Sequence, residues 1–387
     1  MRLALLTTDG RNLLRDYTAA KPCFGTAPKA LLHGFAEIPE IEVHVVSCIQ
    51  QPARSPEKIA DNIWFHSLVV PKIGWMRTLY QGCIRATRKK LRELQPDIVH
   101  GQGTEKECAL AAALSGFPNV MTIHGNMAEL ARLFHARFGS YGWLAGKLEN
   151  FTLKRTGGVF CNSAYTESLI RPRAQKIWRV PNALRREFFD AVPAGERPCV
   201  LLNVGAVTER KRQLELLDVA QRLRGRGLKF EIHFIGPLNP SDAYAAAFAA
   251  RLKPLEAEGC VRHLGVLPTP ELIRHFDSAA ALVHFPSEES FGLVVAEALA
   301  RNLKLFGSRV GGIADITEGV PGAELFAVND WNGLTEAIAG WMAKGHPQAE
   351  GGADVMRERY HPTVIARRHL EIYAEVLSFR SSQPLNK

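Results

Sequence analysis

The chain has 387 residues, of which 46% are hydrophobic and 22% charged, and it contains 32 Gly, 22 Pro and 7 Cys. This composition excludes disordered and fibrous proteins, and no apolar run reaches the ~18–20 residues that cross a bilayer. The length predicts two domains. The net charge of +9 is uneven, because residues 1–182 carry +10 and the remainder −1, which calls for a physical reason or an anionic partner.

The first apolar run is short and ends at Asp9. It predicts a buried strand and not a secretory signal, whose apolar segment is longer, so we expect a cytoplasmic protein. The seven cysteines are widely spaced and form no C-x-x-C pair. We therefore expect buried thiols, with neither a disulfide framework nor a zinc site.

Short apolar or β-branched runs alternate with longer helical patterns, which predicts parallel sheets covered by helices. In the first half, strands are expected at 2–8, 43–47, 98–102, 120–124, 158–162 and 176–180. In the second half they are expected at 200–204, 231–235, 261–264, 281–285, 304–307 and 324–326. The helices between these later strands are expected at 213–224, 243–257, 271–278, 293–300 and 334–343.

Pro and Gly cluster where the first series of strands ends and the second begins, and they mark an inter-domain linker at 183–198. The predicted domains are therefore 1–182 and 199–361, followed by an amphipathic helix at 362–379. The predicted fold class is α/β, with two Rossmann-like, doubly wound parallel sheets.

The segment 283–300 carries the strongest chemical signal. It predicts a strand that ends at Pro286, a polar turn, and a helix that begins near Phe291. Ligands of open parallel sheets bind beyond the carboxyl ends of the strands, and the first turn of a helix offers N–H groups and a positive dipole end to phosphate. We predict that the amides of Phe291, Gly292 and Leu293 form such a phosphate site.

Glu289 and Glu297 flank the predicted phosphate site. Eight residues of helix rise ~12 Å, so the two carboxylates are too far apart to share one proton transfer. They are instead suited to accept charge-assisted hydrogen bonds from hydroxyls at the two ends of a sugar–diphosphate–ribose ligand.

These motifs resemble the retaining group 1 glycosyltransferases of the GT-B fold (glycosyltransferase family 4 type). The signature of that family is a Glu-x7-Glu pair after Pro-Ser, an Ala-rich helix and a downstream Gly-Gly turn. In this chain the matching residues are Pro286, Ser287, Glu289, Glu297, Ala298, Ala300, Gly311 and Gly312. The resemblance covers residues 1–378 and implies two domains facing across a cleft that holds the active site. It also implies that Glu289 holds the hydroxyls of the donor sugar and Glu297 the ribose, and that the last helix crosses back to the first domain.

A second match lies in the turn that opens the second domain. The family has Gly-Arg there, with a Lys six residues after the Gly. Gly205 and Lys211 fit this pattern, whereas Ala206 stands where the Arg is usual. The resemblance implies that Lys211 neutralises the leaving diphosphate, a direct stabilisation of the transition state. Either Arg210 or Arg212 takes the place of the missing Arg.

In the first domain, His124 ends a predicted strand and precedes a Gly, and this resembles the family position that approaches the donor sugar. Gly25 falls where the family has a pair of glycines near phosphate or acceptor, although here only one is present. His100 ends another predicted strand, and we expect it to be structural.

The resemblance implies a glycosyltransferase that moves a sugar, with retention, from a nucleotide-diphosphate sugar to a glycan, lipid-linked or small-molecule acceptor, as in cell-envelope polysaccharide synthesis. No nucleophile triad and no metal-ligand spacing is evident, so no cofactor and no metal are expected. Two alternatives stay open: a sugar epimerase or phosphorylase of the same fold, and a decayed, non-catalytic nucleotide-sugar-binding protein.

The basic segment 75–92 interleaves cations with Trp75, Leu79, Tyr80 and Ile84. In the family the first domain binds the acceptor, so a cationic surface there suits an anionic glycan or the inner face of an anionic membrane. A solvated helix face is the alternative. Nucleic-acid binding is not expected, because no recognised module is present.

Overall fold

The computed structural model describes the backbone of residues 1–192 and 195–381, and the side chains as far as residue 378; linker residues Pro193 and Ala194 lie outside the described residues. The described chain forms two compact units. Unit 1 comprises Met1–Arg185 together with the chain from Tyr360 onward, and unit 2 comprises Arg186–Arg359. Among the described helices, none combines the length and the apolar character that crossing a membrane requires.

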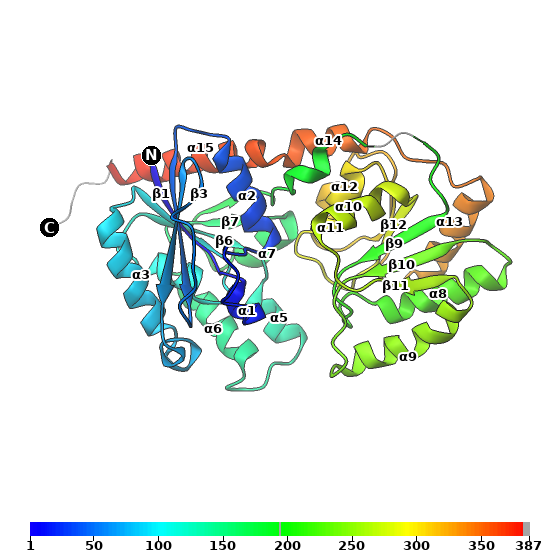
Figure 1. Cartoon of the computed structure of the whole chain (residues 1–387), viewed down its shortest axis with the longest axis horizontal. Helices are drawn as coiled ribbons and strands as arrows, with labels where there is room; N and C mark the ends of the chain where they lie inside the picture. Colours follow the sequence, from blue (N-terminus) through cyan, green and yellow to red (C-terminus); the bar gives the residue numbers. More distant parts are fainter. Residues whose placement is uncertain (193–194, 382–387) are drawn as a thin grey trace. The chain divides into compact units, whose positions relative to one another are not determined.

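A sheet of eight strands forms the centre of unit 1 (Figure 1). In spatial order the strands are β3 (Lys58–Ala60), β4 (Ile63–Val69), β2 (Glu42–Ile49), β1 (Arg2–Leu6), β5 (Ile98–Gln102), β6 (Asn119–Ile123), β7 (Val159–Cys161) and β8 (Ile177–Arg179). Only β3 is antiparallel to its neighbour in this sheet. Numbered along the chain, the parallel strands follow the order 3-2-1-4-5-6-7, so the direction of winding reverses between β1 and β5.

Helices cover both faces of this sheet, as the alternation of side chains along a strand requires. Leu3 and Leu5 of β1 pack with α2 (Thr26–Ala36) and α15 (Pro362–Ser381), whereas Ala4 and Leu6 pack with α3 (Gln81–Leu94) and α4 (Glu107–Ala113). Gly34 lets α2 and α15 meet, because a Cβ there would lie 2.1 Å from the carbonyl oxygen of Pro362.

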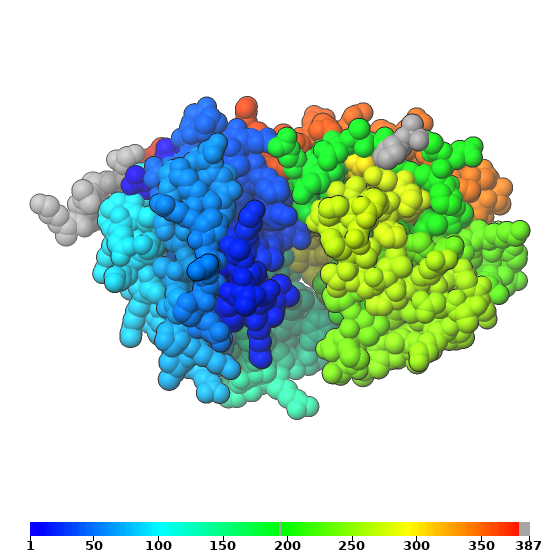
Figure 2. Space-filling model, in the orientation of Figure 1, coloured from blue at the N-terminus to red at the C-terminus, as the bar shows by residue number. Residues whose placement is uncertain are grey.

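The other helical elements of unit 1 are shorter or lie nearer its surface. They are α1 (Arg11–Leu14), η1 (Lys72–Gly74), η2 (Met76–Thr78), α5 (Met127–Leu133), α6 (Tyr141–Leu153) and α7 (Ala164–Ile170). The segment with α1 forms part of the surface of unit 1 and is dark blue in Figure 2.

Unit 2 is built on a sheet of six parallel strands. Their spatial order is β11 (Val261–His263), β10 (Glu231–Ile235), β9 (Val200–Val204), β12 (Ala281–His284), β13 (Lys304–Ser308) and β14 (Ala323–Phe326). Numbered along the chain, this is the order 3-2-1-4-5-6 of a doubly wound sheet, with the reversal between β9 and β12. The inner strands are almost fully buried, as expected where helices cover both faces.

The helical elements of unit 2 connect these strands and lead back towards unit 1. They are η3 (Arg186–Phe189), α8 (Gln213–Gly225), α9 (Ala243–Ala257), α10 (Thr269–Ser278), α11 (Leu293–Ala300), α12 (Gly312–Thr317), α13 (Trp331–Ala343) and α14 (Gly352–Tyr360). Side chains of α8, α9 and α13 share one core with the strands, and α10, α11 and α12 follow β11, β12 and β13 along the chain.

The strands predicted from the sequence are all present, each within two residues at either end. The sequence analysis missed β3 and β4, because β4 alternates buried Ile63 and Phe65 with half-exposed polar residues and so lacks a continuous apolar run. It also treated 183–198 as a linker with few apolar residues. In the structure residues 183–185 belong to unit 1, and the chain from Arg186 onward belongs to unit 2, where Phe188 is fully buried and its ring lies 5.4 Å from that of Phe276.

Candidate donor site at the strand reversal of unit 2

The polar residues predicted for the donor lie where the winding of unit 2 reverses. Strands β9 and β12 are adjacent and parallel, with Leu202 opposite Leu282, so the loops that follow them leave the same edge of the sheet. These loops are 205–212 and 285–292. Such a reversal point is where open α/β sheets bind ligands.

Lys211 and Glu289 contact each other across these two loops. The Nζ of Lys211 donates to Oε2 of Glu289, and NH1 of Arg210 lies 3.9 Å from Oε1 of Glu289 and 3.2 Å from Oε2 of Glu288. Backbone contacts fix the loops to each other, since Ser287 N donates to Arg210 O at 2.9 Å and Arg210 NH1 donates to Glu288 O at 2.9 Å. Two cations and two carboxylates are thus held at the reversal point.

His284, the last residue of β12, makes a further contact with Glu289. Its Nε2 lies 3.2 Å from Oε2 of the carboxylate. Burial, reinforced by the Lys211 ammonium, lowers the pKa of His284 to about 4, so the ring is neutral at pH 7 and donates through Nε2–H. Burial acts to raise the pKa of Glu289, but Lys211 and the His284 hydrogen bond outweigh it and hold this pKa well below its usual range. Glu289 is therefore ionised and fixed in orientation.

The structure separates the two arginines that the sequence left as alternatives. Arg210 lies at the two glutamates, as described. Arg212 points elsewhere, because its NH1 donates to Val328 O and its guanidinium carbon lies 4.7 Å from the ring centre of Trp331. Arg210 is therefore the arginine that stands beside Lys211.

Two glycines shape these loops. Gly205 follows β9 with φ 153°, and its amide donates to Ile235 O at 2.8 Å. A Cβ at this position would touch the stem of Lys211 at 3.7 Å. Gly292 has φ 100° and is the N-cap of α11. Residues with a side chain rarely adopt either conformation, so both turns depend on glycine.

The helix after this turn begins at Leu293, not near Phe291 as predicted, because the left-handed Gly292 interrupts it. Glu289 therefore lies in a loop, and the prediction that eight residues of helix separate it from Glu297 is wrong. Phe291 lies outside the helix and is buried, so Gly292 and Leu293 are the predicted residues that remain at the helix start. Glu297 lies on α11 with only 4% exposure, and its contact with ribose stays a prediction.

The downstream Gly-Gly turn positions the loop that carries Glu289. The amide of Gly312 donates to Glu289 O at 3.1 Å. A Cβ on Gly312 would lie 2.6 Å from the Cα of Phe291, so only glycine allows this close approach. The Gly-Gly turn and the Glu-x7-Glu motif are therefore parts of one packed arrangement.

In unit 1, the predicted donor contact His124 directly follows β6. Its Nε2 lies 2.9 Å from Oε1 of Gln102, and burial lowers its pKa to about 4 against a hydrogen bond with Asn182. Gln102 in turn contacts His100, which is fully buried and also bonded to Tyr373 of α15. His124 thus ends a network of neutral polar groups, and the buried His100 is structural.

Comparison with known protein families assigns both halves of the chain. The family described as Glycosyltransferase Family 4 matches residues 30–188, and that described as Glycosyl transferases group 1 matches residues 198–344. The chain belongs to the group 1 glycosyltransferases of family 4 type. The predicted family is confirmed.

Solved structures of similar fold match this glycosyltransferase over nearly its whole length. A sucrose-phosphate synthase from Thermosynechococcus elongatus has 17% identity and a TM-score of 0.77, covering 98% of this chain and 100% of that one. Alr3699/HepE from Anabaena, in complex with UDP and glucose, has 15% identity and a TM-score of 0.70, with 97% and 100% coverage. The lipopolysaccharide outer core galactosyltransferase WaaB has 16% identity and a TM-score of 0.66, also with 97% and 100% coverage. The predicted GT-B fold class is confirmed. A search of curated proteins found no match.

Sequence reasoning missed one titratable residue near the sheet edge of each unit of this glycosyltransferase, Glu105 in unit 1 and His284 in unit 2. The carboxylate of Glu105 accepts from Gly125 N at 2.9 Å, and burial raises its pKa. It occupies the space of the side chain that Gly103 lacks, since a Cβ there would lie 2.1 Å from Oε2. The only available signal was the Gly two residues before the Glu at a strand end. His284 was missed because a strand-end His is usually structural.

The loop between β1 and α2 contains a buried ion pair that the sequence did not reveal. Arg11 and Asp9 are almost fully buried and pair at 2.6 Å, and Arg11 also donates to Arg54 O at 2.8 Å. Gly25 at the end of this loop is the exposed N-cap of α2 with φ −56°, a conformation open to any residue. Its role near phosphate or acceptor stays a prediction.

Three metal-ligating side chains meet in the core of unit 1. One atom each from Cys48, Cys83 and Glu107 lies within 4.8 Å of the others, although these residues are widely spaced along the sequence. Neither carboxylate oxygen of Glu107 has a hydrogen-bond partner among the described residues, and burial raises its pKa to about 7. All seven thiols are free; five are buried, as expected, whereas Cys199 is half-buried and Cys23 is exposed.

Proposed function

We propose that this glycosyltransferase moves a sugar from a nucleotide-diphosphate donor to an acceptor hydroxyl, with retention at the anomeric carbon and without a metal ion. The observation that carries the proposal is the Lys211–Glu289 pair at the strand reversal of unit 2. This adjacent pair of opposite charges can bind both parts of such a donor. The cation can bind the diphosphate, and the carboxylate can accept hydrogen bonds from the sugar hydroxyls.

Lys211 and Arg210 supply the positive charge for the diphosphate. An ammonium has three donors, so Lys211 can keep one bond to Glu289 and direct the others to phosphate oxygens. The amides that open α11 at Gly292 and Leu293 add donors to the same edge of the sheet. Because these groups are fixed before the reaction, they stabilise the charge that develops on the leaving diphosphate without reorganising. They also supply the charge that a divalent ion would otherwise provide.

The electrostatics of Glu289 support transfer without a side-chain base or nucleophile. A carboxylate whose pKa lies well below its usual range is a weak base, and His284, with a pKa near 4, is a weak base as well. Glu289 is therefore suited to hold hydroxyls and poorly suited to attack the anomeric carbon. A leaving phosphate oxygen would take the acceptor proton, with the acceptor attacking from the same face of the sugar.

The structural relatives support the donor class. Alr3699/HepE from Anabaena is solved with UDP-glucose and with UDP. For the present chain we propose a nucleotide-sugar donor, a glycan, lipid-linked or small-molecule acceptor, and a cytoplasmic location in peripheral contact with the inner face of the membrane. The basic character of unit 1 supports an anionic acceptor side or membrane side.

A thermal-shift panel of UDP-, GDP-, ADP- and TDP-sugars tests the donor class. A ligand at about 100 times its Kd stabilises the folded state by ~2.7 kcal/mol, which is readily measured. We expect one nucleotide class to stabilise the wild type and the Arg222→Ala control, which changes an exposed arginine of α8, but to stabilise Lys211→Ala much less. No shift with any nucleotide sugar would overturn the proposal. Product analysis with labelled donor then separates transfer from epimerisation, phosphorolysis or mere binding.

A further inference from the structure

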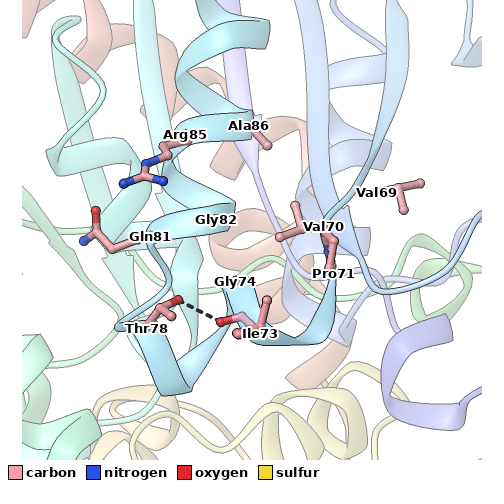
Figure 3. Close-up of a pocket in the computed structure, with 10 residues that line it drawn as sticks. All are labelled: Val69, Val70, Pro71, Ile73, Gly74, Thr78, Gln81, Gly82, Arg85 and Ala86. Carbon is pink, nitrogen blue, oxygen red and sulfur yellow. Dashed lines mark hydrogen bonds between the residues drawn. The ribbon is translucent and has the colours of Figure 1, made fainter.

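A groove opens on unit 1 where β4 ends and α3 begins (Figure 3). Its volume is about 620 Å³. Val69, Val70, Pro71 and Ile73 give it an apolar side, and Gln81 and Arg85 of α3 give it a polar side. The groove therefore offers an apolar channel with a cation at its wall.

The turns that form this groove are fixed by specific contacts. The indole N–H of buried Trp75 donates to Val70 O at 3.0 Å, and the hydroxyl of Thr78 donates to Ile73 O at 2.9 Å, the dashed line in Figure 3. Gly74 and Gly82 pack backbone against backbone, since a Cβ on Gly82 would lie 2.6 Å from the Cα of Gly74. These contacts thus fix the turn that carries Ile73 in place.

Large apolar side chains stand exposed around this groove. Ile73 is 71% exposed, Val69 51% and Leu79 44%. The end of β4 and the two turns after it present these three side chains to water and so lose the free energy that their burial would provide. Such clusters mark surfaces that meet another apolar phase. We call these three side chains, Val69, Ile73 and Leu79, the apolar rim; their exposure indicates a surface that contacts another molecule or phase.

The chain segment that lines the groove carries charge of one sign. From residue 62 to residue 92 the chain has seven Lys and Arg and no Asp or Glu. Lys72 and Arg77 are exposed on the same turns as Ile73, and Arg85, Arg88 and Lys89 are exposed on α3. Exposed apolar tips surrounded by cations are complementary to an anionic lipid surface, where acyl chains take up the apolar groups and headgroups attract the cations.

The geometry points to this groove as a docking site for an anionic phospholipid surface, with an acyl chain against Val69 and Ile73 and a lipid phosphate at Arg85. An anionic glycan or free phosphate would satisfy the cations but would leave the apolar rim in water. The inference rests on the proposed peripheral position of the enzyme and not on its sugar chemistry. It names the surface and the lipid class that the proposed function leaves open.

Co-sedimentation of the full chain with vesicles tests the inference. The vesicles are phosphatidylcholine alone, or phosphatidylcholine mixed with phosphatidylglycerol. We expect binding only to the mixed vesicles, and a loss of at least about tenfold in affinity for Ile73→Ser, because Ser cannot replace the apolar surface that Ile73 would bury in the lipid. Arg85→Gln should weaken binding several-fold. The matched control is Val266→Ser, which removes an equally exposed apolar side chain of unit 2 and should bind as the wild type.

Three outcomes would overturn the inference: equal binding to both vesicle types, no binding to either, or binding to mixed vesicles that Ile73→Ser leaves unchanged. The last would indicate attraction by charge alone. Each variant is also examined for stabilisation by the nucleotide sugar. Retained stabilisation with lost vesicle binding supports the docking site, and it shows that the variant is folded. If no nucleotide sugar stabilises the wild type, that result would instead count against the proposed function.

Discussion

The two units share the doubly wound strand order 3-2-1-4-5-6, but they treat the carboxyl groups of Glu289 and Glu105, near their sheet edges, in opposite ways. At the reversal point of unit 2, Lys211 and the hydrogen bond from the neutral His284 hold the pKa of Glu289 well below its usual range, so this carboxylate stays charged. At three residues of unit 1, burial favours the neutral form: the pKa of His124 falls to about 4, and those of Glu105 and Glu107 rise. A charged edge suits a diphosphate, and a neutral polar edge suits sugar and acceptor hydroxyls. The doubly wound sheet thus supplies a position, and the neighbouring side chains decide its chemistry.

The largest effect is expected at the charged edge. Lys211→Ala and Glu289→Ala should each lower kcat at least tenfold, a loss of ~1.4 kcal/mol in barrier stabilisation. Losses as large as ~10²–10³ are known for a single preorganised donor. Steady-state kinetics with the donor found by the thermal-shift panel measure this. Near-normal rates in both variants would show that the charged sheet edge of unit 2 has no special role in catalysis compared with the neutral edge of unit 1.

The second effect is on stability and belongs to the neutral core of unit 1. The pKa of Glu107 is about 7 in the folded chain and near 4.5 when exposed. Between these values the unfolded chain has lost the proton that the folded chain keeps, so a rise in pH favours unfolding. Stability from this group is complete below about pH 4.5 and is lost as pH rises through about 7, by up to roughly 3 kcal/mol.

The Glu107→Gln variant lacks this titrating carboxyl. As pH rises from about 4.5 to about 8, its free energy of unfolding should therefore increase relative to that of the wild type. Urea unfolding at several pH values measures this difference, with Glu40→Gln as the control at an exposed glutamate of unit 1. Parallel pH dependence of wild type and Glu107→Gln would mean that burial does not hold this carboxyl neutral.

A third comparison separates the two arginines beside Lys211. Arg210→Ala should raise KM for the donor or lower kcat by about tenfold, as expected when one charge-assisted contact of ~1.5–3 kcal/mol is lost. Arg212→Ala should leave kinetics close to those of the wild type, because Arg212 is engaged with Val328 and Trp331. The reverse ranking would show that the loop rearranges when donor binds.

The smallest effect is expected at the neutral edge. Because His124 is neutral at pH 7, Gln can replace it as an uncharged hydrogen-bonding group. His124→Gln should lower kcat/KM by roughly fivefold, about 1 kcal/mol for one neutral hydrogen bond. The ratio of variant to wild-type rates should not change between about pH 5.5 and 8, since neither side chain titrates there. A ratio that varies strongly over this range would show that a charged His124 contributes.

Local sequence patterns predicted the strands and both chemical motifs, because buried parallel strands and strand-end turns leave strong local signals. Gly205, Lys211 and Glu289 could be placed at strand ends without coordinates, whereas the adjacency of the two strands, β9 and β12, comes from the structure. The start of α11 could not, since it depends on the backbone angle of Gly292.

Contacts between residues far apart in the chain also could not be predicted from the sequence. The choice between Arg210 and Arg212 is decided by Trp331, more than a hundred residues away, and the meeting of Cys48 with Glu107 is decided by the packing of three elements. Such features depend on tertiary contacts that leave no local pattern. The half-buried alternation of β4 was missed for a different reason, because it resembles a polar loop.

The most direct test of the central claim is a calorimetric comparison of the preferred nucleotide sugar with its nucleoside diphosphate. If Lys211 holds the diphosphate and Glu289 holds the sugar, Lys211→Ala should weaken both ligands by at least about tenfold, ~1.4 kcal/mol. Glu289→Ala should weaken the nucleotide sugar alone. Equal weakening of both ligands by Glu289→Ala, or unchanged diphosphate affinity in Lys211→Ala, would contradict the division of roles at this edge of unit 2.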